Sequence, residues 1–142
     1  MGAILSTLPS FTLYNFEKIQ EHIKNKSIII NTLESTNQEC LISGTIGIEE
    51  EIKLLNAYLK TNKTILIIIY GRNNSDISVI KKHKQLQSLG FTNIALYLGG
   101  LFEWLLLQDI YGKELFPTTK KELDILKYKS NQMLNIALLE YK

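Results

Sequence analysis

A continuous apolar run from Thr64 to Tyr70 leads directly into the polar segment formed by residues 71–76. This run contains four isoleucines and no regular alternation, which is typical of a strand buried on both faces at the centre of a parallel sheet. A helix is predicted to follow from about Asp76 to Leu89 and to end at Gly90. Because parallel strands need helical crossovers, this order predicts an α/β fold.

The rest of the chain repeats the alternation of strands and helices. Hydrophobic spacing predicts helices over residues 13–23 (with Thr12 as N-cap), 48–60, 101–110 and 119–140, and strands over residues 27–32 and 93–98, with a brief apolar piece at 40–42. Leu123 and Leu126 are expected on the buried face of the last helix. We therefore predict a three-layer α/β/α domain over residues 12–142, including a C-terminal helical extension, after an N-terminal lead-in of residues 1–11.

Composition narrows the classes of function. The net charge of +2 in 142 residues is close to balanced, so nucleic acid is not an expected partner. The run 81–84, which contains His83, is predicted to be a solvated helix face. Cys40 is the single cysteine, which excludes an intrachain disulfide and a thiolate zinc cluster and fits a reducing, cytoplasmic setting. His22 and His83 lack ligand spacing, so the sequence implies no metal and no cofactor.

The first residues satisfy the M-G-x-x-x-[ST] pattern, because Gly2 follows the initiator methionine and Ser6 occupies the last position. Gly2 is thereby a candidate for N-myristoylation in a eukaryotic cytosol. No apolar run approaches the roughly 20 residues that cross a bilayer. One acyl chain would give only weak, peripheral membrane association, and no second anchor lies nearby.

Three segments together resemble a rhodanese-like domain. Residues 43–46 are similar to the glycine-containing "GHIxGAI" segment of that family, and residues 67–76 are similar to its active-site strand and loop. The most specific match is Leu89-Gly90-Phe91-Thr92-Asn93-Ile94 followed by Leu98-Gly99-Gly100-Leu101-Phe102-Glu103-Trp104, which resembles "LGFxNV…GGxxxW". The resemblance implies a rhodanese-like α/β/α fold, and Trp104 is expected in its core.

The chain departs from the family where the chemistry occurs. Active rhodaneses open the loop with a cysteine that carries the transferred sulfur as a persulfide, and Gly71 occupies that position here. Neither Gly71 nor its loop neighbours supplies a thiolate. Asp76 stands where the family often has an arginine, and the early "DxR" pair corresponds to Asn31 and Leu33. The resemblance therefore implies an inactive homologue, a pseudoenzyme.

The loop can still bind a ligand through its backbone N–H groups. A loop that wraps before a helix can point successive N–H groups inward and bind a small anion. The expected ligand-binding residues are those of this vestigial loop: Gly71, Arg72, Asn73, Asn74, Ser75, Asp76 and Ile77. The leading interpretation is a module that acts by binding or regulation through a protein partner.

Three alternatives stay open at this stage. The first is an enzyme of different chemistry on an anionic substrate, with Asp76 or Asp109 as its acid or base. The second is a sulfurtransferase that uses Cys40, although lone cysteines are usually small buried hydrophobic residues. The third is a structural subunit that dimerises through the last helix. The sequence does not define the oligomeric state.

Overall fold

The computed structural model describes residues 10–131, which contain a five-stranded parallel sheet with the strand order β1-β5-β4-β2-β3. The strands are β1 (Thr12–Leu13), β2 (Ile28–Asn31), β3 (Thr45–Ile46), β4 (Ile67–Tyr70) and β5 (Ile94–Tyr97). The helices are α2 (Phe16–Lys24), α3 (Ile48–Thr61), α4 (Ser78–Leu89) and α5 (Gly100–Tyr111), with 3₁₀ turns η1 (Ser35–Asn37) and η2 (Ile125–Tyr128).

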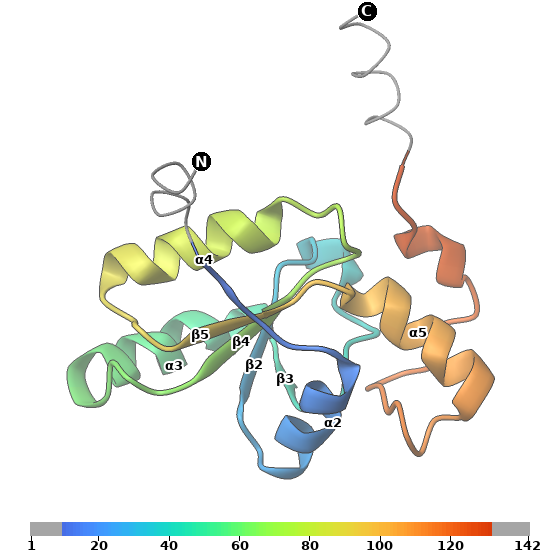
Figure 1. The fold of residues 1–142 in the computed structure, drawn as a ribbon, viewed down its shortest axis with the longest axis horizontal. Coiled ribbons are helices and arrows are strands. Elements are labelled where there is room, and N and C mark those ends of the chain that lie inside the picture. The colour runs from blue at the N-terminus through green and yellow to red at the C-terminus, as the bar shows by residue number, and fades with distance from the viewer. Residues whose placement is uncertain (1–9, 132–142) are drawn as a thin grey trace, which may run out of the picture.

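The sheet is covered on both faces, as the sequence predicts (Figure 1). Helices α3 and α4 cover one face, and α2 and α5 cover the other. Successive strand residues point to opposite faces, so β4 sends Ile67 and Ile69 to the α3–α4 side and Ile68 and Tyr70 to the α2–α5 side. All four side chains are fully buried, which explains why this strand is continuously apolar.

The register of the three central strands places their carboxyl ends at one level. Asn31 of β2 pairs with Tyr70 of β4, and Tyr70 pairs with Tyr97 of β5. The segments that follow these strands therefore leave the sheet at the same edge, which is where open α/β sheets place ligand sites.

The first helix begins later than predicted. Thr12 lies in the edge strand β1 and pairs with Ala95, so it does not cap a helix. Asn15 is the N-cap of α2, and its Oδ1 accepts a hydrogen bond from the Lys18 amide at 3.0 Å. The apolar piece at 40–42 forms no strand, and only Ile42 makes an isolated antiparallel bridge, to Thr118.

The prediction of a helix that starts at Thr119 is wrong for residues 119–131, where the structure has only the 3₁₀ turn η2. The Thr119 hydroxyl donates to the Glu39 carbonyl and accepts from the Leu41 amide, so it is unavailable as a cap. Leu123 and Leu126, expected in the core, are 82% and 62% exposed. The remainder of the predicted helix lies outside the described residues.

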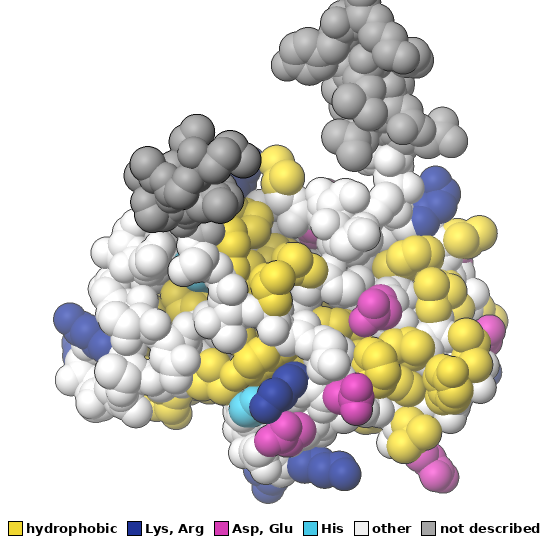
Figure 2. Space-filling model, in the orientation of Figure 1, with side chains coloured by type: hydrophobic (Ala, Val, Ile, Leu, Met, Phe, Trp, Pro, Cys, Tyr) yellow, Lys and Arg dark blue, Asp and Glu magenta, His cyan; other side chains and the backbone are white. Residues whose placement is uncertain are grey.

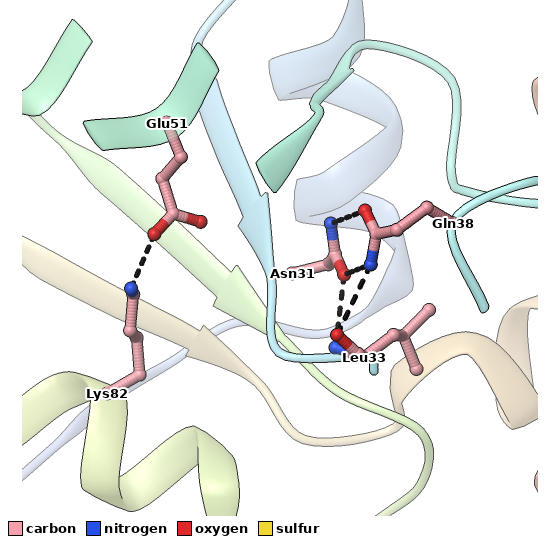
Figure 3. Close-up of polar contacts among 5 residues, drawn as sticks. All are labelled: Asn31, Leu33, Gln38, Glu51 and Lys82. Carbon is pink, nitrogen blue, oxygen red and sulfur yellow. Dashed lines mark hydrogen bonds and ion pairs between the residues drawn. The ribbon is translucent and has the colours of Figure 1, made fainter. Parts of the chain in front are cut away.

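The basic run at 81–84 is not wholly solvated. His83 is buried because it lies four residues after Val79 and three before Leu86, on the face of α4 that packs against the sheet. The Lys82 ammonium forms an ion pair with buried Glu51 and so ties α4 to α3 (Figure 3).

This burial predicts a pH dependence of stability. Desolvation lowers the pKa of His83. Its ring packs edge-on against Phe11, with 4.9 Å between the two ring centroids. The unfolded chain therefore binds a proton near pH 6.5 while the folded chain resists it, and the free energy of unfolding should fall as the pH drops below about 6.5. Urea denaturation between pH 7 and pH 5 should show this loss, and His83→Gln should reduce it; an unchanged slope in the variant would contradict the assignment.

Candidate functional site

The candidate site lies where β2, β4 and β5 end, and it is built around the loop of residues 71–77. Helix α5 begins directly against this loop: the Leu101 amide donates to the Gly71 carbonyl at 2.9 Å, and the Phe102 amide donates to the Arg72 carbonyl at 2.8 Å. Gly100 has φ +68°, and a Cβ there would lie 2.7 Å from the Gly71 carbonyl oxygen. The double glycine thus lets α5 approach the loop backbone closely.

The Asp76 carboxylate lies inside the loop and accepts backbone hydrogen bonds at both ends. Its Oδ2 accepts from the Arg72 amide at 2.9 Å, and its Oδ1 accepts from the Ser78 amide at 3.0 Å. These are the inward amide groups on which an anion cradle would depend. The protein's own carboxylate therefore occupies one donor that the sequence suggests for an external anion, the Arg72 amide, and also the Ser78 amide just beyond the predicted loop.

Two hydroxyl groups hold this carboxylate in place. The Ser78 hydroxyl oxygen lies 2.5 Å from Asp76 Oδ1 and 2.7 Å from Thr32 Oγ1. Since an ionised carboxylate only accepts, Ser78 donates to Asp76 and accepts from Thr32. Thr32 directly follows β2, so this chain of hydrogen bonds joins the ends of two strands to the start of α4.

Gly71 is buried, and the structure leaves no space for a side chain at this position. A Cβ built on Gly71 would overlap Asp76 Oδ2 and would lie 2.8 Å from both Thr32 Oγ1 and Val79 Cγ2. The volume that a side chain at position 71 would need is therefore already filled, chiefly by the Asp76 carboxylate.

A distant segment, residues 127–130, covers the loop from outside. The Arg72 guanidinium donates to the Lys127 carbonyl, and Asn73 Nδ2 donates to the Tyr128 carbonyl at 2.8 Å. The guanidinium carbon also lies 5.5 Å from the Tyr128 ring centroid, in cation–π geometry. We call residues 127–130 the cover segment. Arg72 and Asn73, expected as anion donors, are thus engaged with this segment.

The remaining predicted loop residues point outward or serve the loop itself. Asn74, Ser75 and Ile77 are exposed. The Ser75 amide donates to Asn73 Oδ1 at 2.9 Å, as in an Asx turn. Ser130 Oγ lies 3.3 Å from both Asn74 Oδ1 and the Ser75 hydroxyl, which adds two contacts to the cover segment.

The side-chain amides of Asn31 and Gln38 form a neutral pair after β2 (Figure 3). Asn31 is buried, and its Oδ1 accepts from Gln38 Nε2 at 2.8 Å while its Nδ2 donates to Gln38 Oε1 at 3.2 Å. Asn31 Oδ1 also accepts from the Leu33 amide, and Gln38 Nε2 donates to the Leu33 carbonyl. The two amides satisfy each other without a buried charge.

Asn31→Ala should lower the free energy of unfolding by about 2 kcal/mol, because the Leu33 amide and the Gln38 side chain lose their buried partner. Asn56→Ala, at an exposed position of α3, is a matched control and should change it by less than about 0.5 kcal/mol. Urea titration followed by the fluorescence of Trp104 measures both. Equal losses in the two variants would contradict a stabilising amide pair.

Cys40 does not reach the loop. Its side chain is buried and its Sγ donates to the Lys120 carbonyl at 3.2 Å. Burial raises the pKa of this thiol, which favours the protonated, unreactive form. The interpretation of Cys40 as a small buried hydrophobic residue therefore agrees with its position.

The alternative acid or base residues lie apart from each other. Both oxygens of Asp76 are used within the loop, whereas Asp109 lines a hollow of about 280 Å³ between α5 and residues 118–125. Within residues 10–131 no cluster of three or more His, Cys, Asp or Glu side chains could hold a metal ion. Burial raises the pKa of Tyr70 and of Tyr97, which keeps both phenols protonated. The Tyr97 hydroxyl donates to Glu103, and the Tyr70 hydroxyl accepts from the Ile42 amide.

No protein-family model matches the sequence, and no curated protein matches it either. Solved structures do match. A rhodanese-like domain from Anabaena sp. aligns over 86% of this chain and 86% of its own length, with 20% identity and a TM-score of 0.53. An As-Sb reductase from Leishmania major aligns over 91% of this chain and 99% of its own, with 17% identity and a TM-score of 0.59.

The chain has a rhodanese-like fold. Thiosulfate sulfurtransferase from Pseudomonas aeruginosa matches 68% of this chain with 19% identity and a TM-score of 0.53, and the aligned part is 19% of that longer protein. At these identities the likeness is one of fold. Residues 71–77 directly follow β4, which is where the sequence predicts the vestigial loop.

The sequence does not point to the residues that hold Asp76 in place, Thr32 and Ser78, or to the cover segment. Ser78 carried a local signal, because Asp-x-Ser before a helix is a common turn and cap pattern. Thr32 directly follows the apolar run of β2, which places it at the carboxyl edge of the sheet. The cover segment had no signal, since Arg72 and Lys127 are separated by 55 residues.

Proposed function

We propose that this chain is a catalytically inactive rhodanese-like module that acts by binding a protein partner. The observation that carries the proposal is the Asp76 carboxylate, which lies where a nucleophile at position 71 would stand and accepts the Arg72 and Ser78 amides. Sulfur transfer needs a thiolate at that position to receive the sulfane sulfur. Cys40, buried and bonded to the Lys120 carbonyl, does not replace it.

The cover segment supports the same proposal. A sulfurtransferase must admit thiosulfate and then an acceptor to the loop, whereas here Lys127, Tyr128 and Ser130 contact the loop from outside. A loop that is engaged by another segment of its own chain fits a module whose surface, rather than its pocket, is used for recognition.

Steady-state assay of purified protein with thiosulfate and cyanide tests the proposal. We expect no thiocyanate formation above the buffer rate, either for the wild-type chain or for Cys40→Ser. Turnover by the wild-type chain that Cys40→Ser abolishes would support a sulfurtransferase with a displaced cysteine. Turnover that survives Cys40→Ser would indicate chemistry that needs no thiol; either result would overturn the proposal.

A second expectation concerns the N-terminus, which lies outside the described residues. We propose that the module associates weakly with membranes when Gly2 is myristoylated, and that it is otherwise cytoplasmic. None of the helices within residues 10–131 is long and apolar enough to cross a bilayer. Coexpression with an N-myristoyltransferase should add one acyl chain to the intact mass, and Gly2→Ala should remove the addition. An unmodified wild-type mass would end this proposal.

A further inference from the structure

Helix α5 exposes apolar side chains that a helix of its composition normally buries. The helix is apolar on most sides: Leu101, Trp104 and Leu105 pack into the core, whereas Ile110 is 69% exposed on the outer side. A helix with so wide an apolar surface is usually enclosed by other elements. Its outer side therefore lacks a cover among residues 10–131.

The exposed side chains continue from α5 onto the chain that follows it. We call this the outer apolar surface; Figure 2 shows hydrophobic side chains gathered over α5 and the segment after it. A hollow of about 280 Å³ lies between α5 and residues 118–125, and it is lined by Leu105, Leu123 and Ile125 together with polar and charged side chains. The exposed hydrophobic residues that form the surface are Leu106, Ile110, Tyr111, Leu115, Leu123 and Leu126.

We propose that residues 132–142 of the same chain pack on the outer apolar surface. This segment is itself rich in apolar residues, and Leu134, Ala137, Leu138 and Tyr141 among them recur at helical spacing. Exposed in water, it and the outer apolar surface would both leave large apolar side chains unburied. Packing one against the other removes both from water.

Residues 132–142 begin close to the outer apolar surface, which favours them over a second copy of the chain. The described residues end at Asn131, three positions after η2, and η2 packs against α5. An attached segment has an effective concentration in the millimolar range, which a second copy of the chain does not reach at ordinary protein concentrations. Eleven residues in a helix span about 16 Å, close to the roughly 18 Å of the twelve-residue α5.

Hydrogen–deuterium exchange on the full chain tests the proposal. Amide exchange of residues 132–142 should be about tenfold slower, or more, than in a synthetic peptide of the same sequence. Ile110→Lys should return exchange to the peptide rate, because a charge then lies on the packing surface. Ile52→Lys is the matched control, since Ile52 on α3 is 68% exposed and Ile110 is 69% exposed. It should leave the protection unchanged.

Substitutions within residues 132–142, and exchange measured at a second protein concentration, distinguish packing within one chain from packing between two copies. Leu134→Glu combined with Leu138→Glu should also abolish protection, while Trp104 fluorescence confirms that the core is intact. Exchange at the peptide rate in the wild-type chain would overturn the proposal, as would protection that Ile110→Lys leaves intact. Protection that grows with protein concentration, together with a dimer mass by light scattering, would assign the surface to a second copy and would equally overturn it. The packing involves none of residues 71–77, so these outcomes do not depend on the sulfurtransferase assay.

Discussion

Gly100→Ala is expected to lower the free energy of unfolding by about 3–5 kcal/mol, from backbone strain plus overpacking. Position 100 has φ +68°, which an alanine adopts only at a cost. The new methyl group would also lie 2.7 Å from the Gly71 carbonyl oxygen and 2.9 Å from the Asn73 amide nitrogen. The loop cannot retreat without breaking the hydrogen bonds that Leu101 and Phe102 donate to it.

Gly90→Ala separates the two contributions. Gly90 also has a positive φ, +117°, but its nearest neighbour would be the flexible Lys63 side chain at 3.4 Å. This variant should therefore lose only the strain term, about 1–2 kcal/mol. Urea denaturation followed by the buried Trp104 reports both values. Similar losses in the two variants would show that the close approach of α5 to the loop contributes little.

Gly71→Cys is expected to destabilise the fold by about 2–4 kcal/mol, since its Cβ overlaps a fixed carboxylate. The Asp76 side chain must leave the loop to make room, and the Arg72 and Ser78 amides then lose their acceptor. Gly47→Cys is the control, because a Cβ there meets nothing within 4 Å and φ is −64°. It should cost no more than about 1 kcal/mol, the size of an N-cap effect.

A double-mutant cycle tests whether Asp76 is the obstacle. Asp76→Ala alone should cost about 1–2 kcal/mol through the unpaired amides. The Gly71→Cys and Asp76→Ala double variant should be more stable than the sum of the single losses predicts, by about 1–2 kcal/mol. Strict additivity would mean that Thr32 and Val79, rather than the carboxylate, set the limit at position 71.

The fold could largely be predicted because its signals are local and repeated. The run that forms β4 and the glycine that ends α4 each specify their own element, and the structure has both where the sequence places them. The predicted helix starts at Thr12 and Thr119 were wrong, although threonine is a common N-cap residue. Thr12 pairs with β5 in the sheet, and the Thr119 hydroxyl is hydrogen-bonded to Glu39 and Leu41. Tertiary partners decide such positions, and a single sequence does not display them.

The position of the candidate site in the chain could be predicted from the sequence, but the hydrogen bonding inside its loop could not. The loop follows β4, as the resemblance to the rhodanese-like fold implies. From sequence, Asp76 reads as a charge that repels anions. In the structure it is the anion that the loop amides bind, held there by Ser78 and, through Ser78, by Thr32. That arrangement joins the ends of two strands and so depends on the register of the sheet.

Intact-mass spectrometry after incubation with thiosulfate tests the inactivity of this loop directly. A competent thiolate would attack the sulfane sulfur of thiosulfate, retain that sulfur as a persulfide and release sulfite. For the wild-type chain we predict an unchanged mass under conditions in which an active thiosulfate sulfurtransferase gains one sulfur atom. A wild-type chain that gains one sulfur atom, lost again on addition of cyanide, would contradict the inactivity proposed here.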